Sequence, residues 1–271
     1  MIMLKDLYIC SIKNDKFFFI TNPLKQFEIV DNIGFNIKIF NLICISATNL
    51  VLYLTAGFFL IVFIKLTTNN NSKLVSSKWS IVNESLFTTI NNIVISQIDS
   101  KKGQKYFPFI YALFIFILIN NLIGMVPYSF ASTSHFILTF SLSFTIVLGA
   151  TVLGFSNYKL KYFSILVPSG CPLLLLPLLV LIEFISYLAR NISLGLRLAA
   201  NIFSGHMLLN ILSGFTFNIL TYGGILPLIF GLLPLSFIIA FSGLELAIAF
   251  IQAQVFIILS SSYVKDSICL H

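Results

Sequence analysis

Two long apolar arms in the C-terminal half restrict the fold of this sequence more than any other feature. The first arm runs from Pro172 to about Leu212 and the second from about Ile225 to Val264, and Pro177 and Pro234 are among the few turn signals within them. A helix of forty residues is about 60 Å long, roughly twice the ~30 Å hydrocarbon thickness of a bilayer. Each arm is therefore either one steeply tilted helix or two ordinary spans broken at a proline.

The chain as a whole is also too apolar for a soluble protein. Of its 271 residues, 58% are hydrophobic and only 9% are charged, whereas soluble domains carry about 25% charged residues. We expect an all-α polytopic membrane protein with about five membrane helices. The two arms, at about 172–266, form a hairpin of very long, steeply tilted helices in this prediction.

Three shorter spans are expected before the arms. The first covers about 41–64, which is long enough to cross the hydrocarbon. The second and third form a hairpin over about 106–156, from 106–130 and 135–156, and the polar segment VPYSFASTSH makes the turn between them.

Two segments are expected to lie outside the hydrocarbon. The segment at about 78–100 is too polar to span, yet its apolar residues recur near helical spacing, so it is predicted as an interfacial amphipathic helix with Trp79 at headgroup depth. Residues 1–30 lack the apolar core of a secretory signal and are expected to form an N-terminal surface segment or a leader, with the membrane domain covering 31–271.

The lysines predict the orientation of the chain. They occur between the first and second spans, again two crossings later, and after the two arms: Lys65, Lys73, Lys78, Lys101, Lys102, Lys105, Lys159, Lys161 and Lys265. Basic loops stay on the side of negative potential. Five crossings with the C-terminus on that side place all of these lysines on one face.

The only two arginines of the chain, Arg190 and Arg197, lie within the first apolar arm. Glu183, Arg190 and Arg197 are seven residues apart each time and share one helix face, which Asn201 joins, whereas His206 points nearly opposite to Arg197. Placing an arginine side chain in hydrocarbon costs at least ~3 kcal/mol of free energy, so we expect each arginine to have a structural or functional role. Arg190 is either neutralised by Glu183 as a structural pair or functional; for Arg197 we favour a function.

The acids and the histidine in the two arms are chemically different from these arginines. A guanidinium does not deprotonate, so Arg197 blocks protons and attracts carboxylates. Glu183, His206, Glu245 and Asp266 can each take up and release a proton once burial tunes them. Titratable groups on both sides of a permanent positive charge indicate two polar half-paths with a barrier between them, a design for ion translocation. Small residues beside Arg197 suit a partner that slides past at short range: Ser193, Gly195, Ala199, Ala200, Ser204 and Gly205.

Several other functions are excluded by the same sequence. The net charge is +7, but no basic patch interleaved with aromatic residues occurs, so we expect no nucleic-acid partner. Cys10, Cys44, Cys171 and Cys269 are far apart and only three histidines are present, so we expect no metal site and no cofactor. No GxxxxGK[ST] motif occurs, so we expect the chain to bind no nucleotide.

The motifs of the arms resemble a known family. ISLGLRLAANIFSGHMLL, followed by LELAIAFIQAQVF, is similar to subunit a of the F-type ATP synthase, the ATPase-six subunit of its proton channel. NPLKQFEI, NNLIGMVPYSF and SSYVKDSICLH extend the resemblance from about residue 22 to the C-terminus, and the fungal-like mitochondrial type is the most similar. One departure is Gln254, where an aromatic residue is usual.

The resemblance implies roles for individual residues. Arg197 would be the essential arginine that faces the ring of c subunits and separates two half-channels. Glu183 and Asp266 would serve the path to the matrix, and His206, Glu245 and Asn121 the path from the intermembrane side. Supporting polar groups would be Asn201 and Gln252, beside the arginine, and Arg190.

The resemblance also implies partners and a location. The partners would be the ring of c subunits, the peripheral-stalk subunit b and other membrane subunits of the ATP synthase, with lipids such as cardiolipin. The location would be the mitochondrial inner membrane, with the N-terminus on the intermembrane side and the C-terminus in the matrix.

Two rival functions belong to other classes. A self-contained secondary transporter with a buried Arg–Glu site would show inverted repeats and short broken helices, whereas the two halves of this sequence are unequal. A purely structural assembly scaffold leaves Arg197 unexplained. Replacing Arg197 with lysine separates these hypotheses.

Overall fold

The structure is a computed structural model that describes residues 23–39, 43–68, 78–98, 100–126, 129–167, 175–221 and 225–268. Its helices are α1 (Asn49–Thr68), α2 (Lys78–Ile98), α3 (Ser100–Gly124), α4 (Phe136–Tyr158), α5 (Leu176–Thr221) and α6 (Ile225–Ile268). Three 3₁₀ segments are η1 (Pro23–Phe27), η2 (Ser132–Ser134) and η3 (Lys159–Leu166). An antiparallel hairpin of β1 (Asp31–Ile39) and β2 (Ile43–Thr48) precedes α1.

Five of these helices are long and apolar enough to cross a membrane, namely α1, α3, α4, α5 and α6. The expected all-α polytopic class is confirmed for the membrane helices. The small β-hairpin is an addition that the sequence analysis did not include.

Each apolar arm is one unbroken helix. The 46 residues of α5 and the 44 residues of α6 correspond to about 69 and 66 Å, so both must lie steeply tilted to remain in ~30 Å of hydrocarbon. Pro177 is the second residue of α5, where its missing N–H costs nothing, and Pro234 lies inside α6 without ending it. The alternative of two broken spans per arm is therefore wrong.

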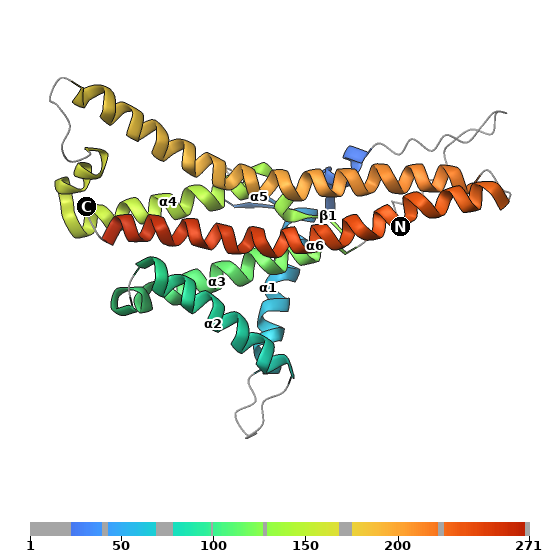
Figure 1. The fold of residues 1–271 in the computed structure, drawn as a ribbon, viewed down its shortest axis with the longest axis horizontal. Helices are drawn as coiled ribbons and strands as arrows, with labels where there is room; N and C mark the ends of the chain where they lie inside the picture. The colour runs from blue at the N-terminus through green and yellow to red at the C-terminus, as the bar shows by residue number, and fades with distance from the viewer. Residues whose placement is uncertain are drawn as a thin grey trace.

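The two long helices are antiparallel neighbours along most of their length. At one end the rings of Tyr187 and Tyr263 lie 5.8 Å apart, and near the other end Gly231 packs against Leu220. Figure 1 shows the two helices running together along the longest dimension, with the first part of α5 diverging from α6 and α1 projecting away from the pair. The polar residues of α5 therefore lie at different points along the length of one continuous helix pair.

The core lies where α3 and α4 pack against α5 and α6. Its largest buried side chains include Phe114 on α3 and Phe256 on α6. The amphipathic helix α2 adds Ile90, Val94 and Ile98, which recur every four residues and are buried against α3 and α6. Trp79, at the start of α2, is 70% exposed.

Two span boundaries differ from the sequence prediction. The first span begins at Asn49 and not at about 41, because residues 43–48 form β2, where Ile43, Ile45 and Thr48 favour an extended chain. The second span ends at Gly124 and not at 130. Val126 precedes Pro127, and a residue before proline disfavours helix, so the chain leaves α3 at this point.

The expected N-terminal surface segment lies partly within the described residues. Residues 1–22 lie outside them. The η1 segment packs on α5, where the rings of Phe27 and Phe203 are 4.7 Å apart. Asn210 Nδ2 donates a hydrogen bond of 3.3 Å to Gln26 Oε1. Residues 23–27 are therefore an ordered segment docked on the second half of α5.

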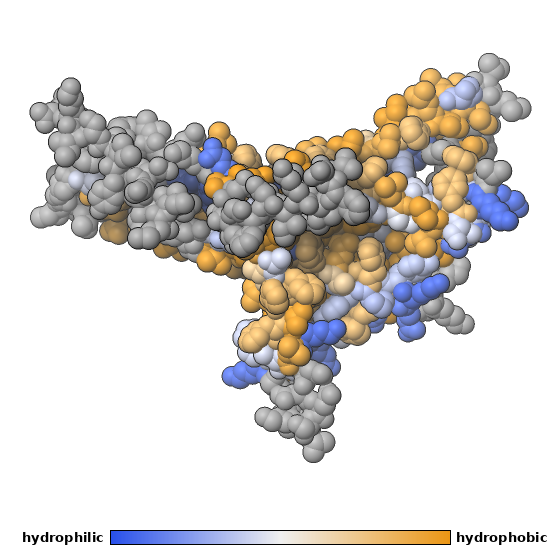
Figure 2. Space-filling view, turned by 180° about the vertical axis from the view of Figure 1, so that it is seen from behind, coloured by the Kyte–Doolittle hydropathy of each residue, from blue (hydrophilic) through white to orange (hydrophobic). Residues whose placement is uncertain are grey.

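The outer surface is largely apolar. Large hydrophobic side chains such as Phe58, Phe59 and Ile137 are exposed. Figure 2 shows that most of the coloured surface on this face is apolar, with hydrophilic groups confined to a few patches. Such a surface requires lipid or other membrane proteins around it.

Candidate functional site

The helix α5 divides its polar residues between two opposite faces. Arg190, Arg197 and Asn201 are exposed, whereas His206 is 8% exposed and lies on the buried face. This confirms the arithmetic of 100° per residue, by which nine residues separate opposite faces. The arginines therefore look outward from the protein, and the histidine looks inward.

Arg197 lies on an open groove on the outer face of α5. The groove has a volume of about 550 Å³ and is lined by Ala189, Ile192, Ser193, Leu196, Arg197 and Ala200. Within the part of the chain that the structure describes, no ion pair joins Arg197 to a carboxylate. A permanent cation in an apolar setting needs a counter-charge, so this groove requires a partner that supplies one.

One turn beyond Arg197, an amide pair connects the two long helices. Asn201 Nδ2 donates a hydrogen bond of 3.1 Å to Gln252 Oε1. Gln252 is buried, and its Nε2 has no hydrogen-bond partner among the described residues. The pair fixes the register of α5 against α6 next to Arg197.

His206, Glu245 and Asn121 come together where α3, α5 and α6 meet. A Cβ atom on Gly205 would lie 2.8 Å from Cδ of Glu245, so the carboxyl group rests directly on α5. Asn121 is fully buried on α3, and its Nδ2 donates a 3.5 Å hydrogen bond to the carbonyl of Ala249, one turn beyond Glu245. A Cβ atom on Gly124 would lie 3.8 Å from His206 Nε2.

This cluster holds polar atoms that lack partners. Glu245 Oε1 and Asn121 Oδ1 are both buried and accept no hydrogen bond from any described residue. Buried polar groups are normally satisfied by protein or water. The place is therefore polar enough to hold water, which is what a proton path needs.

Asp266 lies at the opposite end of the α5–α6 pair, within a group of tyrosines. Tyr187 on α5 is hydrogen-bonded to Tyr162 on η3 and packs edge-on against the buried Tyr263 on α6. Asp266 lies within electrostatic reach of all three tyrosines. The sequence analysis missed these tyrosines, although Tyr187 lies one turn after Glu183 and Tyr263 one turn before Asp266.

Burial raises the pKa of Tyr162, which lies outside the membrane helices, and the charge of Asp266 adds to the rise, while its hydrogen bond with Tyr187 lowers it. This phenol therefore stays protonated and can donate a hydrogen bond at physiological pH.

Arg190 is not paired with Glu183. No ion pair between them occurs in the described chain, and Arg190 instead acts electrostatically on Tyr263. Seven residues are about 10.5 Å along a helix, which is too far for side-chain pairing, since neighbours are three or four apart. The structural-pair interpretation of Arg190 is therefore not supported.

The small residues near Arg197 serve two purposes. Ser193, Ala200 and Ser204 are exposed on the face of the arginine. Gly195 and Ala199 are buried instead, and a Cβ atom on Gly195 would lie 2.9 Å from Ser143 Oγ on α4. Only the exposed members can belong to a sliding surface.

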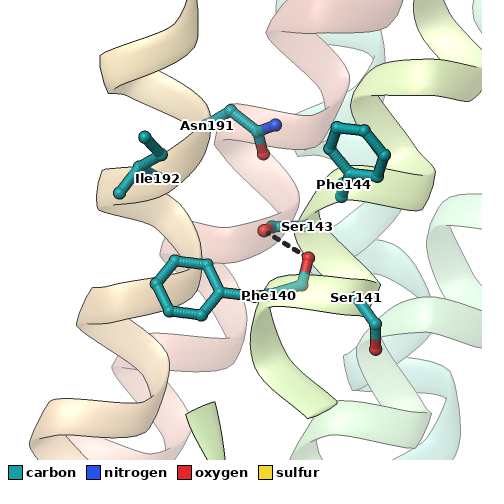
Figure 3. A pocket seen from close by; sticks show the side chains of 6 residues that line it. All are labelled: Phe140, Ser141, Ser143, Phe144, Asn191 and Ile192. Atoms are coloured by element: carbon teal, nitrogen blue, oxygen red, sulfur yellow. Dashed lines mark hydrogen bonds between the residues drawn. The ribbon is translucent and has the colours of Figure 1, made fainter. Parts of the chain in front are cut away.

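A second, smaller cavity of about 290 Å³ lies between α4 and α5. Figure 3 shows its lining, in which the Ser143 hydroxyl donates a 3.0 Å hydrogen bond to the Phe140 carbonyl, and the amide of Asn191 points toward the same space. Its six lining residues include no titratable group, so this cavity is not part of the path of acids and histidine.

Metal binding finds no support in the described ranges, because no group of three or more histidine, cysteine, aspartate or glutamate residues could hold an ion there.

Comparison with known proteins decides the family. The profile of the ATP synthase A chain family matches residues 50–265. The chain belongs to this family. It is 67% identical over 251 residues to ATP synthase subunit a of Podospora anserina, covering 93% of this chain and 95% of that one. It is 66% identical over 256 residues to ATP synthase subunit a of Emericella nidulans, covering 94% and 99%.

Membership of the ATP synthase A chain family places the chain in the membrane-embedded Fo sector, with proton transport and ATP synthesis as its function and other Fo subunits as its partners. The fungal relatives and the five apolar helices together support a mitochondrial membrane protein.

Proposed function

We propose that this chain is the stator half of a proton turbine, in which Arg197 faces a ring of c subunits and separates two offset half-channels. The single observation that carries this proposal is that Arg197 is exposed on one long helix between two polar clusters and has no carboxylate partner among the described residues. Because a guanidinium cannot release its proton, it would block a direct leak while attracting each arriving rotor carboxylate. Coupled proton flow then drives ATP synthesis elsewhere in the complex.

The intermembrane half-channel would pass through Asn121, His206 and Glu245. His206 lies nine residues beyond Arg197, about 13 Å along the helix. A proton held by His206 or Glu245 would be handed to a rotor carboxylate, which then becomes neutral and enters lipid. The unpartnered oxygens of Glu245 and Asn121 support a hydrated path there.

The matrix half-channel would pass through Glu183 and Asp266. Glu183 lies fourteen residues before Arg197, about 21 Å along the helix. The rotor carboxylate would lose its proton there after nearly a full turn, as the approaching cation favours the charged form. Each charge that crosses releases ~2.3 kcal/mol per 100 mV.

The orientation follows from the lysines. Lys65 ends α1, Lys78 and Lys105 lie at the starts of α2 and α3, and Lys265 lies in the last turn of α6. With five crossings these ends share one side, and the positive charge assigns it to the matrix. The N-terminus would then lie on the intermembrane side of the inner membrane. Subunit b and cardiolipin would cover part of the remaining apolar surface.

Replacing Arg197 with lysine tests the arginine. The lysine keeps a positive charge, but it lacks the planar guanidinium group and can deprotonate when desolvated. Proton-driven ATP synthesis should therefore fall at least 100-fold, while the complex still assembles. Ser213→Ala, an exposed position on the same helix whose hydroxyl bonds only its own helix, should keep full activity. If the lysine variant synthesises ATP normally, the proposal is wrong and the hypothesis of a structural assembly scaffold is favoured.

A crosslinking experiment tests the partner. A photoreactive amino acid at Ser193, on the groove of Arg197, should crosslink to the c subunit in the intact complex. The same group at Ile137, which is exposed on α4, should not. Crosslinks of Ser193 to lipid alone would favour the self-contained transporter.

A further inference from the structure

The described part of the connection between α3 and α4 that runs from Ser129 to Ser134 is buried, although its sequence is that of a surface turn. Phe130 and Ala131 are buried, as are Ser129, Ser132, Thr133 and Ser134. Its η2 segment packs against α1, α3, α4 and α5. Connections normally run over the surface, and irregular backbone within a membrane protein occurs only where it is enclosed by protein or lines a wet cavity.

Among the described residues of this connection, the serine hydroxyl groups have hydrogen-bond partners and the Thr133 hydroxyl group does not. Ser129 donates to the carbonyls of Ile123 and Gly124 at 2.7 and 2.8 Å, and Ser134 donates to the carbonyl of Ala131 at 2.6 Å. Thr133 Oγ1 is buried and makes no hydrogen bond within the described chain. The exception is therefore specific to one residue.

His135 holds the second unpartnered atom, two residues further on. Its ring stacks on Phe130 at 4.9 Å, which fixes the plane of the imidazole, while Nε2 is buried without a partner among the described residues. Packing against Phe130 therefore fixes the position of the His135 ring, and Nε2 is left to bind a small partner.

The connection adjoins the polar cluster already described. Gly124 lies between them: a Cβ atom there would be 3.1 Å from Ala131 Cβ and 3.8 Å from His206 Nε2. Ser132 also donates a 3.5 Å hydrogen bond to Asn120, the neighbour of Asn121 on α3. Unpartnered polar atoms thus occur on both sides of Gly124, at Thr133 and His135 and at Asn121 and Glu245.

We propose that the connection from Ser129 to His135 lines a hydrated extension of the path at His206 and Glu245, with Thr133 and His135 as the groups that bind its water. The proposal rests on the proposed intermembrane half-channel and adds a segment to it. Water is the partner that suits these atoms, because it donates to an oxygen or an imidazole nitrogen and fits beside a tightly packed backbone. The two residues would hold a proton-conducting chain of water between the outer compartment and His206.

Thiol labelling of the assembled ATP synthase tests hydration directly. Thr133→Cys is treated with 2-(trimethylammonium)ethyl methanethiosulfonate from the intermembrane side, and the unsubstituted complex is treated in parallel to account for the native cysteines. The matched control is Thr145→Cys on α4, which is exposed between apolar neighbours and whose hydroxyl bonds its own helix. The charged reagent requires water, so Thr133→Cys should be labelled at least tenfold faster. Equal or slower labelling would overturn the proposal.

Matched substitutions test whether the water chain conducts. Thr133→Val keeps the branched shape and His135→Phe keeps a planar ring, but both remove the hydrogen-bonding atoms. Each should lower proton-driven ATP synthesis several-fold with unchanged assembly. Thr133→Ser and His135→Gln keep polar atoms and should retain most of it. Full activity in both apolar variants would refute the extension. If Arg197→Lys still abolishes synthesis in that case, the half-channel proposal stands without this segment.

Discussion

Gly205 on α5 lies directly against the carboxyl group of Glu245 on α6, so that a Cβ atom there would be 2.8 Å from Cδ and 3.1 Å from Cγ. The glycine is needed for space, since it lies inside a regular helix. This contact holds the Glu245 carboxyl group against the residue that precedes His206. The position of Glu245, and not only its residue type, therefore supports its role in the proposed path.

Gly205→Ala should displace the Glu245 carboxyl group and lower proton-driven ATP synthesis at least tenfold. Alanine favours helix by about 1 kcal/mol over glycine, so the complex should still assemble. Gly214→Ala on the same helix is the control, because nothing lies within 4 Å of its Cβ position. Equal activity of the two variants, measured in inverted membrane vesicles, would contradict this role of Gly205.

The hydrogen bond between Asn201 and Gln252 should show energetic coupling. Alanine at both positions should cost less than the two single changes added together, by about 0.5–1.5 kcal/mol, because either single change already breaks the bond. The cycle is measured from thermal unfolding of the purified complex, with Asn201→Ala combined with Ser213→Ala as the uncoupled pair. Strict additivity for Asn201 and Gln252 would mean that the bond contributes nothing to the register.

The two arginines should differ in effect. Arg190 acts on Tyr263 at the far end of the helix pair, whereas Arg197 lies on the open groove without a carboxylate partner in the described residues. Arg197→Gln should abolish proton-driven synthesis, and Arg190→Gln should reduce it no more than about tenfold, because in the proposed mechanism only Arg197 would separate the two half-channels. Rates per assembled complex check this. A larger loss from Arg190→Gln would move the barrier to that end of α5.

Sequence reasoning predicted the parts of this molecule that follow from helical periodicity and length. The two arms are long helices because their apolar pattern has few breaks, and Arg197 and His206 lie on opposite faces because nine residues separate them. Periodicity is a local property and survives folding. The roles of Glu183, Glu245 and Asp266 came from the family motifs and remain proposals.

Tertiary packing was the part that sequence did not reveal. The segment VPYSFASTSH has the proline and hydroxyl residues of a surface turn, yet its serines and Thr133 are buried among four helices. The spacing of Glu183 and Arg190 suggested a pair because it preserves the helix face, but it ignores the rise along the axis. The tyrosines around Asp266 come from three elements, so no single segment signals them.

Gly195→Ala should weaken the packing of α4 on α5. Its Cβ atom would lie 2.9 Å from Ser143 Oγ and 3.3 Å from the carbonyl oxygen of Thr139, and the backbone atom cannot rotate away. We expect about 1–3 kcal/mol of destabilisation, seen as a lower unfolding temperature of the complex. Gly149→Ala on α4, with nothing within 4 Å of its Cβ position, should leave that temperature unchanged or higher. An unchanged unfolding temperature for Gly195→Ala would show that α4 and α5 can shift apart enough to accept the methyl group.

The stability of the complex should depend on His135 at mildly acidic pH. Burial lowers the pKa of His135 below its ordinary value of 6.5, so the folded protein holds it neutral where the unfolded chain would protonate it. As the pH falls through the ordinary value, protonation favours the unfolded chain, and the stability that the neutral histidine contributes is lost.

The control is His135→Gln, which has no titratable group at this position. The unfolding temperature of the unsubstituted complex, relative to that of His135→Gln, should therefore be lower at pH 5.5 than at pH 7.5. An unchanged difference would show that the surroundings of His135 do not disfavour the charged imidazole, and a reversed difference would show that the folded protein prefers it.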